Sequence, residues 1–182
     1  PMRLTNRSLI DVISDDAALI HLQYSTQWDS FAHVGQEFDA DGDGRAEMVY
    51  YNGFRAGQHI LPPLDDGSPG RGAQRLGIET MAVKAIQGRG VLLNLLAHCG
   101  AGRTFVGYDT LMAAMQAQQV QVAPGDMLCL YTGFADALLR MAGDPDVEQL
   151  GHTGAVLDGR DERLQRWIAD MGIAALVADN YA

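Results

Sequence analysis

Short apolar runs alternate along the chain with glycine-rich and acidic turns. Runs of Leu, Val and Ile bounded by Gly, Pro or Asp are typical of buried strands, and apolar residues spaced by three or four are typical of helices. On these grounds we predict strands at 17–24, 48–51, 88–96, 127–132 and 173–178, a helix or turn at 78–86, and helices at 111–118 and 161–171. The alternation indicates an α/β domain with a mixed sheet.

Helix ends are marked by local signals. Asp109 and Thr110 precede the second helix and are suitable caps, and Asp161 opens the third helix, which Gly172 closes. The stretch 53–77 is rich in Gly, Pro and Asp and is predicted to be a long loop.

An acidic segment over 37–45 resembles the start of a calcium-binding loop. Asp39, Asp41 and Asp43 alternate and Gly44 follows, but Tyr50 stands where such a loop needs a bidentate Glu, and no flanking helix pair is evident. We interpret the segment as a plain acidic turn over the site, with a calcium loop as the alternative.

Composition narrows the class of protein. The chain has 182 residues, 47% of them hydrophobic, which suits one globular domain over 1–182. A net charge of −10 repels a phosphate backbone, so nucleic acid is not expected as a partner. No apolar run is long enough to span a membrane and the first residues lack a signal-peptide pattern, so we predict a cytoplasmic protein.

The two cysteines, Cys99 and Cys129, lie in apolar runs, where a thiol behaves as a small buried hydrophobe. We therefore do not expect a disulfide between them. His98 adjoins Cys99, but neighbours in a strand point to opposite faces, which argues against a nucleophile pair.

Polar side chains are concentrated directly after the first predicted strand, between Gln23 and His33. A strand that ends in closely spaced amide, carboxylate and imidazole groups is typical of a functional loop. Asp29 and His33 are the catalytic candidates, as an oriented general base or acid, although a purely structural carboxylate–imidazole pair is the simpler alternative. The substrate-binding candidates are Gln23, Gln27, Trp28, Tyr50 and Tyr51.

Four stretches in the same order resemble the cyclase-like metal-dependent hydrolases, which include kynurenine formamidase and isatin hydrolase. Residues 23–33 resemble the H-x-G-T-H-x-D-x-P-x-H signature, and 88–94 resemble G-R-G-V-L-L-D. Residues 124–134 resemble P-G-D followed by R-T-G-W, and 167–180 resemble the closing helix and strand. The resemblance implies a swivelling three-layer β/β/α domain that assembles as a homo-oligomer.

The resemblance also assigns a metal site. It places the family's ligands at Gln23, Gln27, Asp29 and His33, so that two histidines are replaced by glutamines, and Phe31 stands at the signature proline. Amide oxygens are weak donors, and zinc or manganese would therefore be held weakly, by Asp29 and His33.

The leading hypothesis is a hydrolase of an amide, formamide or lactone bond in a small aromatic or cyclic substrate. Water held by His33 and Asp29 would attack a carbonyl lying against Trp28. The alternative is a metal-free, non-catalytic binding or assembly member of the same fold. The sequence stops two residues after Asp179 and Asn180, so we also expect family segments to lie outside 1–182.

Overall fold

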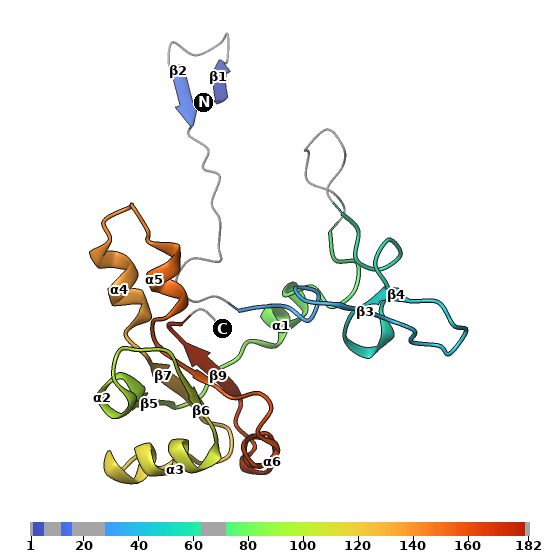
Figure 1. Cartoon of the computed structure of the whole chain (residues 1–182). Helices are drawn as coiled ribbons and strands as arrows, with labels where there is room; N and C mark the ends of the chain where they lie inside the picture. Colours follow the sequence, from blue (N-terminus) through green and yellow to red (C-terminus); the bar gives the residue numbers. More distant parts are fainter. Residues whose placement is uncertain (1, 6–11, 16–27, 63–71, 181–182) are drawn as a thin grey trace.

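The computed structural model describes residues 2–5, 12–15, 28–62 and 72–180 (Figure 1). Strands β1 (Met2–Thr5) and β2 (Val12–Asp15) pair antiparallel. Residues 28–62 and 72–87 form an arm that extends from the body, which is formed by residues 88–180. The predicted strand over 17–24 lies outside the described residues.

Parallel strands organise the body. β5 (Gly90–Asn94), β7 (Met127–Tyr131) and β9 (Ala175–Ala178) form a three-stranded parallel sheet in the order β5-β7-β9. β6 (Thr104–Val106) and β8 (Ala155–Leu157) form a second parallel pair. The predicted α/β class is confirmed, with parallel and antiparallel pairings in separate sheets.

Helices connect these strands, as parallel pairing requires. They are α2 (Leu95–Cys99), α3 (Tyr108–Ala117), α4 (Phe134–Arg140), α5 (Val147–Gly151) and α6 (Glu162–Met171). The predicted helices at 111–118 and 161–171 are therefore present, and α6 ends at Gly172 in the left-handed conformation, as expected.

One face of the parallel sheet supplies the core. Leu93, Leu128 and Leu130 point from β5 and β7 into a cluster that includes Leu111 of α3 and Leu164 of α6. Leu93, Leu128 and Leu111 are fully buried. Leu92, which directly precedes Leu93 in β5, is 64% exposed, because successive side chains of a strand point to opposite faces.

Hydrogen bonds join two of the family-like motifs, residues 88–94 and 124–134. Arg89 donates two hydrogen bonds to Asp126, Nε to Oδ1 at 3.0 Å and Nη2 to Oδ2 at 2.6 Å, and Asp126 is buried. The guanidinium keeps the pKa of Asp126 below its usual range. A Cβ at Gly88 would lie 2.8 Å from the Gly125 carbonyl oxygen, so only glycine permits this approach. The motifs thus lock the start of β5 to the start of β7.

The N-termini of α3 and α6 share one carboxylate. Asp161 caps α6 through Oδ1, which accepts from Arg163 N at 2.9 Å, while Oδ2 accepts from Tyr108 N at 2.7 Å. The prediction that Asp109 and Thr110 cap α3 was wrong. That helix begins at Tyr108 and has no side-chain cap of its own, because the distant Asp161 supplies the acceptor.

The predicted strand over 88–96 proved shorter. β5 ends at Asn94, whose side-chain oxygen accepts from Ala97 N at 2.8 Å and caps α2. His98 and Cys99 therefore lie in a helix, and the argument that they occupy opposite faces of a strand was wrong. Burial raises the pKa of the Cys99 thiol, which makes it a poorer nucleophile at neutral pH.

The arm contains small elements. β3 (Gln36–Phe38) and β4 (Glu47–Val49) pair antiparallel, the one-turn 3-10 helix η1 (Tyr51–Gly53) follows, and α1 (Glu79–Lys84) lies next to the body (Figure 1). The strand predicted at 48–51 begins one residue earlier and ends at Val49. Val49 is the buried hydrophobic residue among those described in the arm.

Candidate functional site

The carboxylate–imidazole pair predicted from the sequence is formed at the start of the arm. His33 N donates to Ser30 O at 2.9 Å, and Ala32 N donates to Ser30 Oγ at 3.2 Å, which closes a tight turn. This turn brings His33 Nε2 to 3.9 Å from Asp29 Oδ1, with both side chains about half exposed. A water-accessible imidazole near a carboxylate is a suitable arrangement for general base chemistry.

An apolar pocket of about 160 Å³ lies on the arm, and neither Asp29 nor His33 lines it. Trp28 supplies one wall, directly before Asp29 in the chain, and the other walls come from Ile78, Met81, Ala82 and Ile86 on and around α1. Trp28 was predicted from the sequence as a substrate-binding residue, but the pocket residues on and around α1 were not. Apolar spacing over 78–86 predicted the helix, but it gave no sign that this face would meet Trp28 instead of the core.

The other aromatic candidates do not line this pocket. Tyr51 stacks on Phe31, with ring centroids 4.6 Å apart and an interplanar angle of 19°. Tyr50 lies over Gly35, where an added Cβ would be 3.1 Å from its ring. Tyr51 therefore packs against the turn that carries Asp29 and His33, whereas Tyr50 packs two residues beyond it.

Gln23 and Gln27 lie outside the described residues, so the described part of the implied metal site consists of Asp29 and His33. Carboxylate and imidazole are suitable donor types for zinc or manganese. Ligand atoms on one tetrahedral zinc ion lie roughly 3.3 Å apart, given metal–ligand distances of about 2.0–2.1 Å. The observed 3.9 Å is close enough for a small side-chain rotation to let both donors bind one ion.

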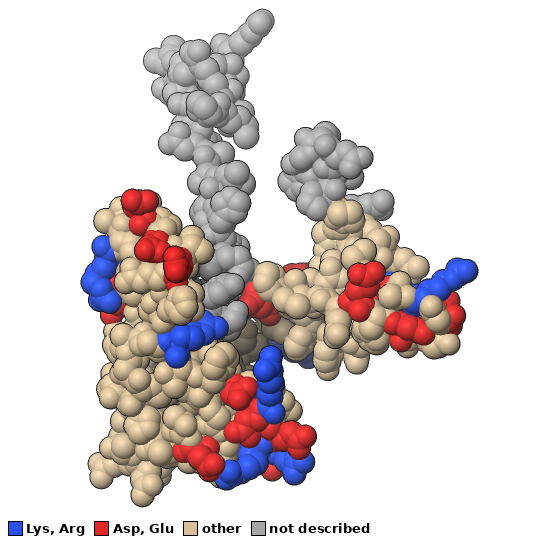
Figure 2. Space-filling view, in the orientation of Figure 1, with Lys and Arg blue, Asp and Glu red and all other residues tan. Residues whose placement is uncertain are grey.

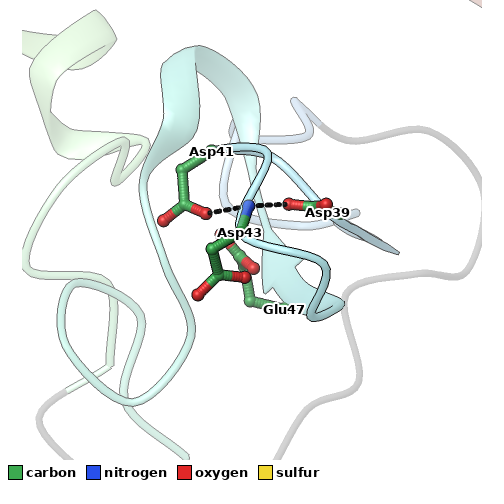
Figure 3. A group of neighbouring side chains, drawn as sticks. All are labelled: Asp39, Asp41, Asp43 and Glu47. Atoms are coloured by element: carbon green, nitrogen blue, oxygen red, sulfur yellow. Dashed lines mark hydrogen bonds between the residues drawn. The ribbon is translucent and has the colours of Figure 1, made fainter.

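A second group of carboxylates lies in the acidic loop between β3 and β4 (Figure 3). Ligand atoms of Asp39, Asp41, Asp43 and Glu47 lie within 4.8 Å of one another, so the group could hold a metal ion. Asp39 also accepts hydrogen bonds from Gly42 N at 2.7 Å and Gly44 N at 2.9 Å, as an acidic side chain does in a plain turn.

Arg55 is already bound to this loop. Its Nη2 lies 2.8 Å from Asp41 Oδ2 and 2.9 Å from Glu47 Oε1. The hydrogen bond from Arg55 lowers the pKa of Asp41. Because an arginine offsets part of the negative charge that a cation would otherwise neutralise, the contacts support the interpretation as an acidic turn.

Charges elsewhere on the visible face are mixed. Figure 2 shows basic side chains standing mostly beside acidic ones, both at the far end of the arm and over the body. Among the described residues, no helix is long and apolar enough to cross a bilayer.

The carboxyl edge of the parallel sheet is closed by Asp179, just beyond β9. Its Oδ1 accepts from Thr132 N at 2.6 Å and Thr132 Oγ1 at 2.8 Å, and its Oδ2 accepts from Gly133 N at 3.0 Å. Asn180 donates to the Ala155 carbonyl at 2.9 Å. These contacts give Asp179 a structural role at the start of α4.

These features define an α/β protein with a parallel sheet at its centre and a carboxylate–imidazole pair on an adjoining arm. The chain matches the Cyclase family model, described as "Putative cyclase", over residues 10–182. It therefore belongs to the Cyclase family, and the predicted family resemblance is confirmed.

A solved structure supports the same assignment. The crystal structure of a novel cyclase superposes with a TM-score of 0.64 and 25% sequence identity, over 97% of this chain and 51% of that chain. The chain thus spans about half the length of that cyclase. No curated protein sequence matches the chain.

Proposed function

We propose that this cyclase-family protein hydrolyses an amide, formamide or lactone bond in a small aromatic or cyclic substrate. The observation that carries the proposal is the exposed Asp29–His33 pair, in a turn that directly follows Trp28, a wall of the apolar pocket. A reactive pair next to an apolar wall can hold a substrate ring and present its carbonyl to water.

The proposed step needs one water and no oxidant. His33 takes a proton from water as the water oxygen bonds to the carbonyl carbon, and Asp29 stabilises the resulting imidazolium. The tetrahedral adduct then collapses, the carbon–nitrogen or ring carbon–oxygen bond breaks, and His33 returns the proton to the leaving atom. The products are an acid and an amine from an amide, or a hydroxy acid from a lactone.

A zinc or manganese ion, if bound, would be held by Asp29 and His33 and would polarise the carbonyl as a Lewis acid. In that case His33 would serve mainly as a ligand. Metal content distinguishes the two cases: the purified protein would be dialysed without chelator and analysed for zinc and manganese alongside His33→Ala.

Hydrolysis of N-formylkynurenine, formanilide and a panel of lactones by the full chain tests the proposal. We expect turnover in the wild type and a loss of about 100-fold or more in kcat/KM for His33→Ala, since general base catalysis contributes on that order. His59→Ala is the matched control, because His59 packs edge-on against Phe54, with ring centroids 5.1 Å apart, and lies in another part of the arm. A metal-free protein inert to the whole panel would support the non-catalytic alternative instead.

We also propose that the protein forms a homo-oligomer in the cytoplasm. Exposed apolar side chains in both parts of the molecule support association, among them Val34 at 73% and Leu92 at 64% exposure. Sedimentation velocity over a range of protein concentrations would test it, and a monomer at all concentrations would contradict it.

A further inference from the structure

The pocket between Trp28 and α1 has a size and lining that restrict what can bind there. Its volume is about 160 Å³, and every lining residue is apolar or aromatic. An apolar cavity of about 150 Å³ is large enough for benzene. The volume of the pocket therefore matches a single six-membered ring.

The chemistry of the lining is equally restrictive. The lining offers an ionised group neither an opposite charge nor a hydrogen-bonding side chain, so the preferred occupant is uncharged. The indole of Trp28 offers a flat face, and Met81 offers a polarisable sulfur, which packs favourably against ring edges. Both features favour an aromatic or flat cyclic group.

One wall of the pocket, Trp28, directly precedes the turn that carries Asp29 and His33. Trp28 directly precedes Asp29, and consecutive Cα atoms are about 3.8 Å apart. A ring lying on Trp28 would thus hold its carbonyl substituent near the Asp29–His33 turn.

We propose that α1 is a specificity element, in which Ala82 and Met81 set the size of the uncharged substrate ring that is bound against Trp28. This inference rests on the proposed hydrolase function for its substrate, but ring binding can be measured without turnover. Ala82 is the smallest lining side chain, so the space above it is what a larger residue would fill.

The neighbouring residue Val83 provides a matched control. It lies on the same helix, is 86% exposed and does not line the pocket. Ala82→Phe and Val83→Phe therefore introduce the same ring at adjacent positions, one inside the pocket and one outside.

Binding would be measured in the Trp167→Phe background, which leaves Trp28 as the single tryptophan. Fluorescence titration with benzyl alcohol should show saturable binding. We expect Ala82→Phe to weaken it about tenfold or more, since one methylene in an apolar pocket changes discrimination by about 10–200-fold, while Val83→Phe has little effect. Benzoate should bind more weakly than benzyl alcohol to all variants.

Enlarging the pocket gives a second test that does not depend on a bulky substitution. Met81→Ala should strengthen binding of 1-naphthylmethanol relative to benzyl alcohol by several-fold, which a general loss of structure would not do. In turnover, Ala82→Phe should raise KM for formanilide but not for formamide, which has no ring.

The outcomes separate this inference from the proposed function. Equal effects of Ala82→Phe and Val83→Phe on ring binding, or a change in sedimentation without a change in binding, would overturn the pocket assignment. Ring binding that follows the variants without any hydrolysis would leave the pocket standing and refute the hydrolase. Hydrolysis that is insensitive to Ala82→Phe would leave the hydrolase standing and refute the pocket assignment.

Discussion

Removal of the Asp179 carboxylate should strongly destabilise the body. Asp179 accepts hydrogen bonds from Thr132 N, Thr132 Oγ1 and Gly133 N at 2.6 to 3.0 Å, and a longer one from Ala135 N at 3.4 Å. Thr132 is almost fully buried, at 1% exposure. In Asp179→Ala, its two donors would lose their charged acceptor in a place that water does not reach.

The size of the effect follows from these contacts. Each buried donor left without a partner costs about 1–3 kcal/mol. The Gly133 and Ala135 amides, at the N-terminus of α4, can be partly rehydrated and add less. With two such donors on Thr132, we expect Asp179→Ala to lower the free energy of unfolding by about 2–6 kcal/mol.

Urea unfolding followed by far-UV circular dichroism would measure this loss, with the denaturant slope checked for each variant. Asp144→Ala is the control, because it removes an exposed carboxylate from the turn after α4 and should change stability by less than about 0.5 kcal/mol. The loss of stability in Asp179→Asn should lie between those of Asp144→Ala and Asp179→Ala. Asparagine keeps one acceptor for Thr132 but turns an NH₂ group toward Gly133 N.

A double-mutant cycle makes the reasoning refutable. Thr132→Val removes the hydroxyl donor, so its cost and that of Asp179→Ala should not add, with a coupling energy of about 1 kcal/mol or more. If Asp179→Ala matches Asp144→Ala within error, or the cycle shows no coupling, the carboxylate does not stabilise the body in the way described.

Other substitutions test the core, a helix start and a strained turn. Leu93→Ala should cost about 2–5 kcal/mol in urea unfolding, whereas Leu92→Ala, on the exposed face of the same strand, should cost less than about 0.5 kcal/mol; similar losses would contradict the register. The hydrogen bond from Tyr108 N lowers the pKa of Asp161, so its stabilising effect is complete above the ordinary Asp pKa and is lost as pH falls through the lowered value. Asp161→Asn should therefore flatten the decline of unfolding midpoints below about pH 4, and an unchanged slope would argue against this role. Gly133→Ala should cost about 1 kcal/mol or more, because Gly133 has φ of +78° and an added Cβ would lie 2.8 Å from a Leu96 methyl; a thermal melt that matches wild type would refute this.

Elements with signals inside a few residues were predictable from the sequence. β7 is an apolar run after a Pro-Gly-Asp turn, and α6 has Asp161 before it and Gly172 after it. Both were predicted within a residue or two. Asp161 also accepts a hydrogen bond from Tyr108 N at the start of α3. This role was not predicted, because the bond joins residues 53 positions apart.

Secondary structure was harder to predict in apolar runs without clear periodicity. Residues 91–96 are hydrophobic apart from Asn94, which determines the change from strand to helix. Its side chain caps α2, and its backbone N–H donates to Gln118 Oε1 across the fold. A strand and a short buried helix look alike in such a run. The same limitation hid the α1 wall of the pocket, which faces Trp28 from about 50 residues away.

The strongest family motifs and the proposed chemistry lie in different parts of the molecule. Arg89 and Asp126 lie in the motifs over 88–94 and 124–134, and their hydrogen bonds to each other fix two strands of the body. Asp29 and His33 are the described residues of the signature that offer reactive groups, and they lie on the arm. Family membership therefore establishes the scaffold without establishing catalysis, because the body could retain its motifs after the arm lost activity. Kinetic and binding measurements on variants of Ala82 and His33 address that question directly, whereas substitutions in the body report on folding alone.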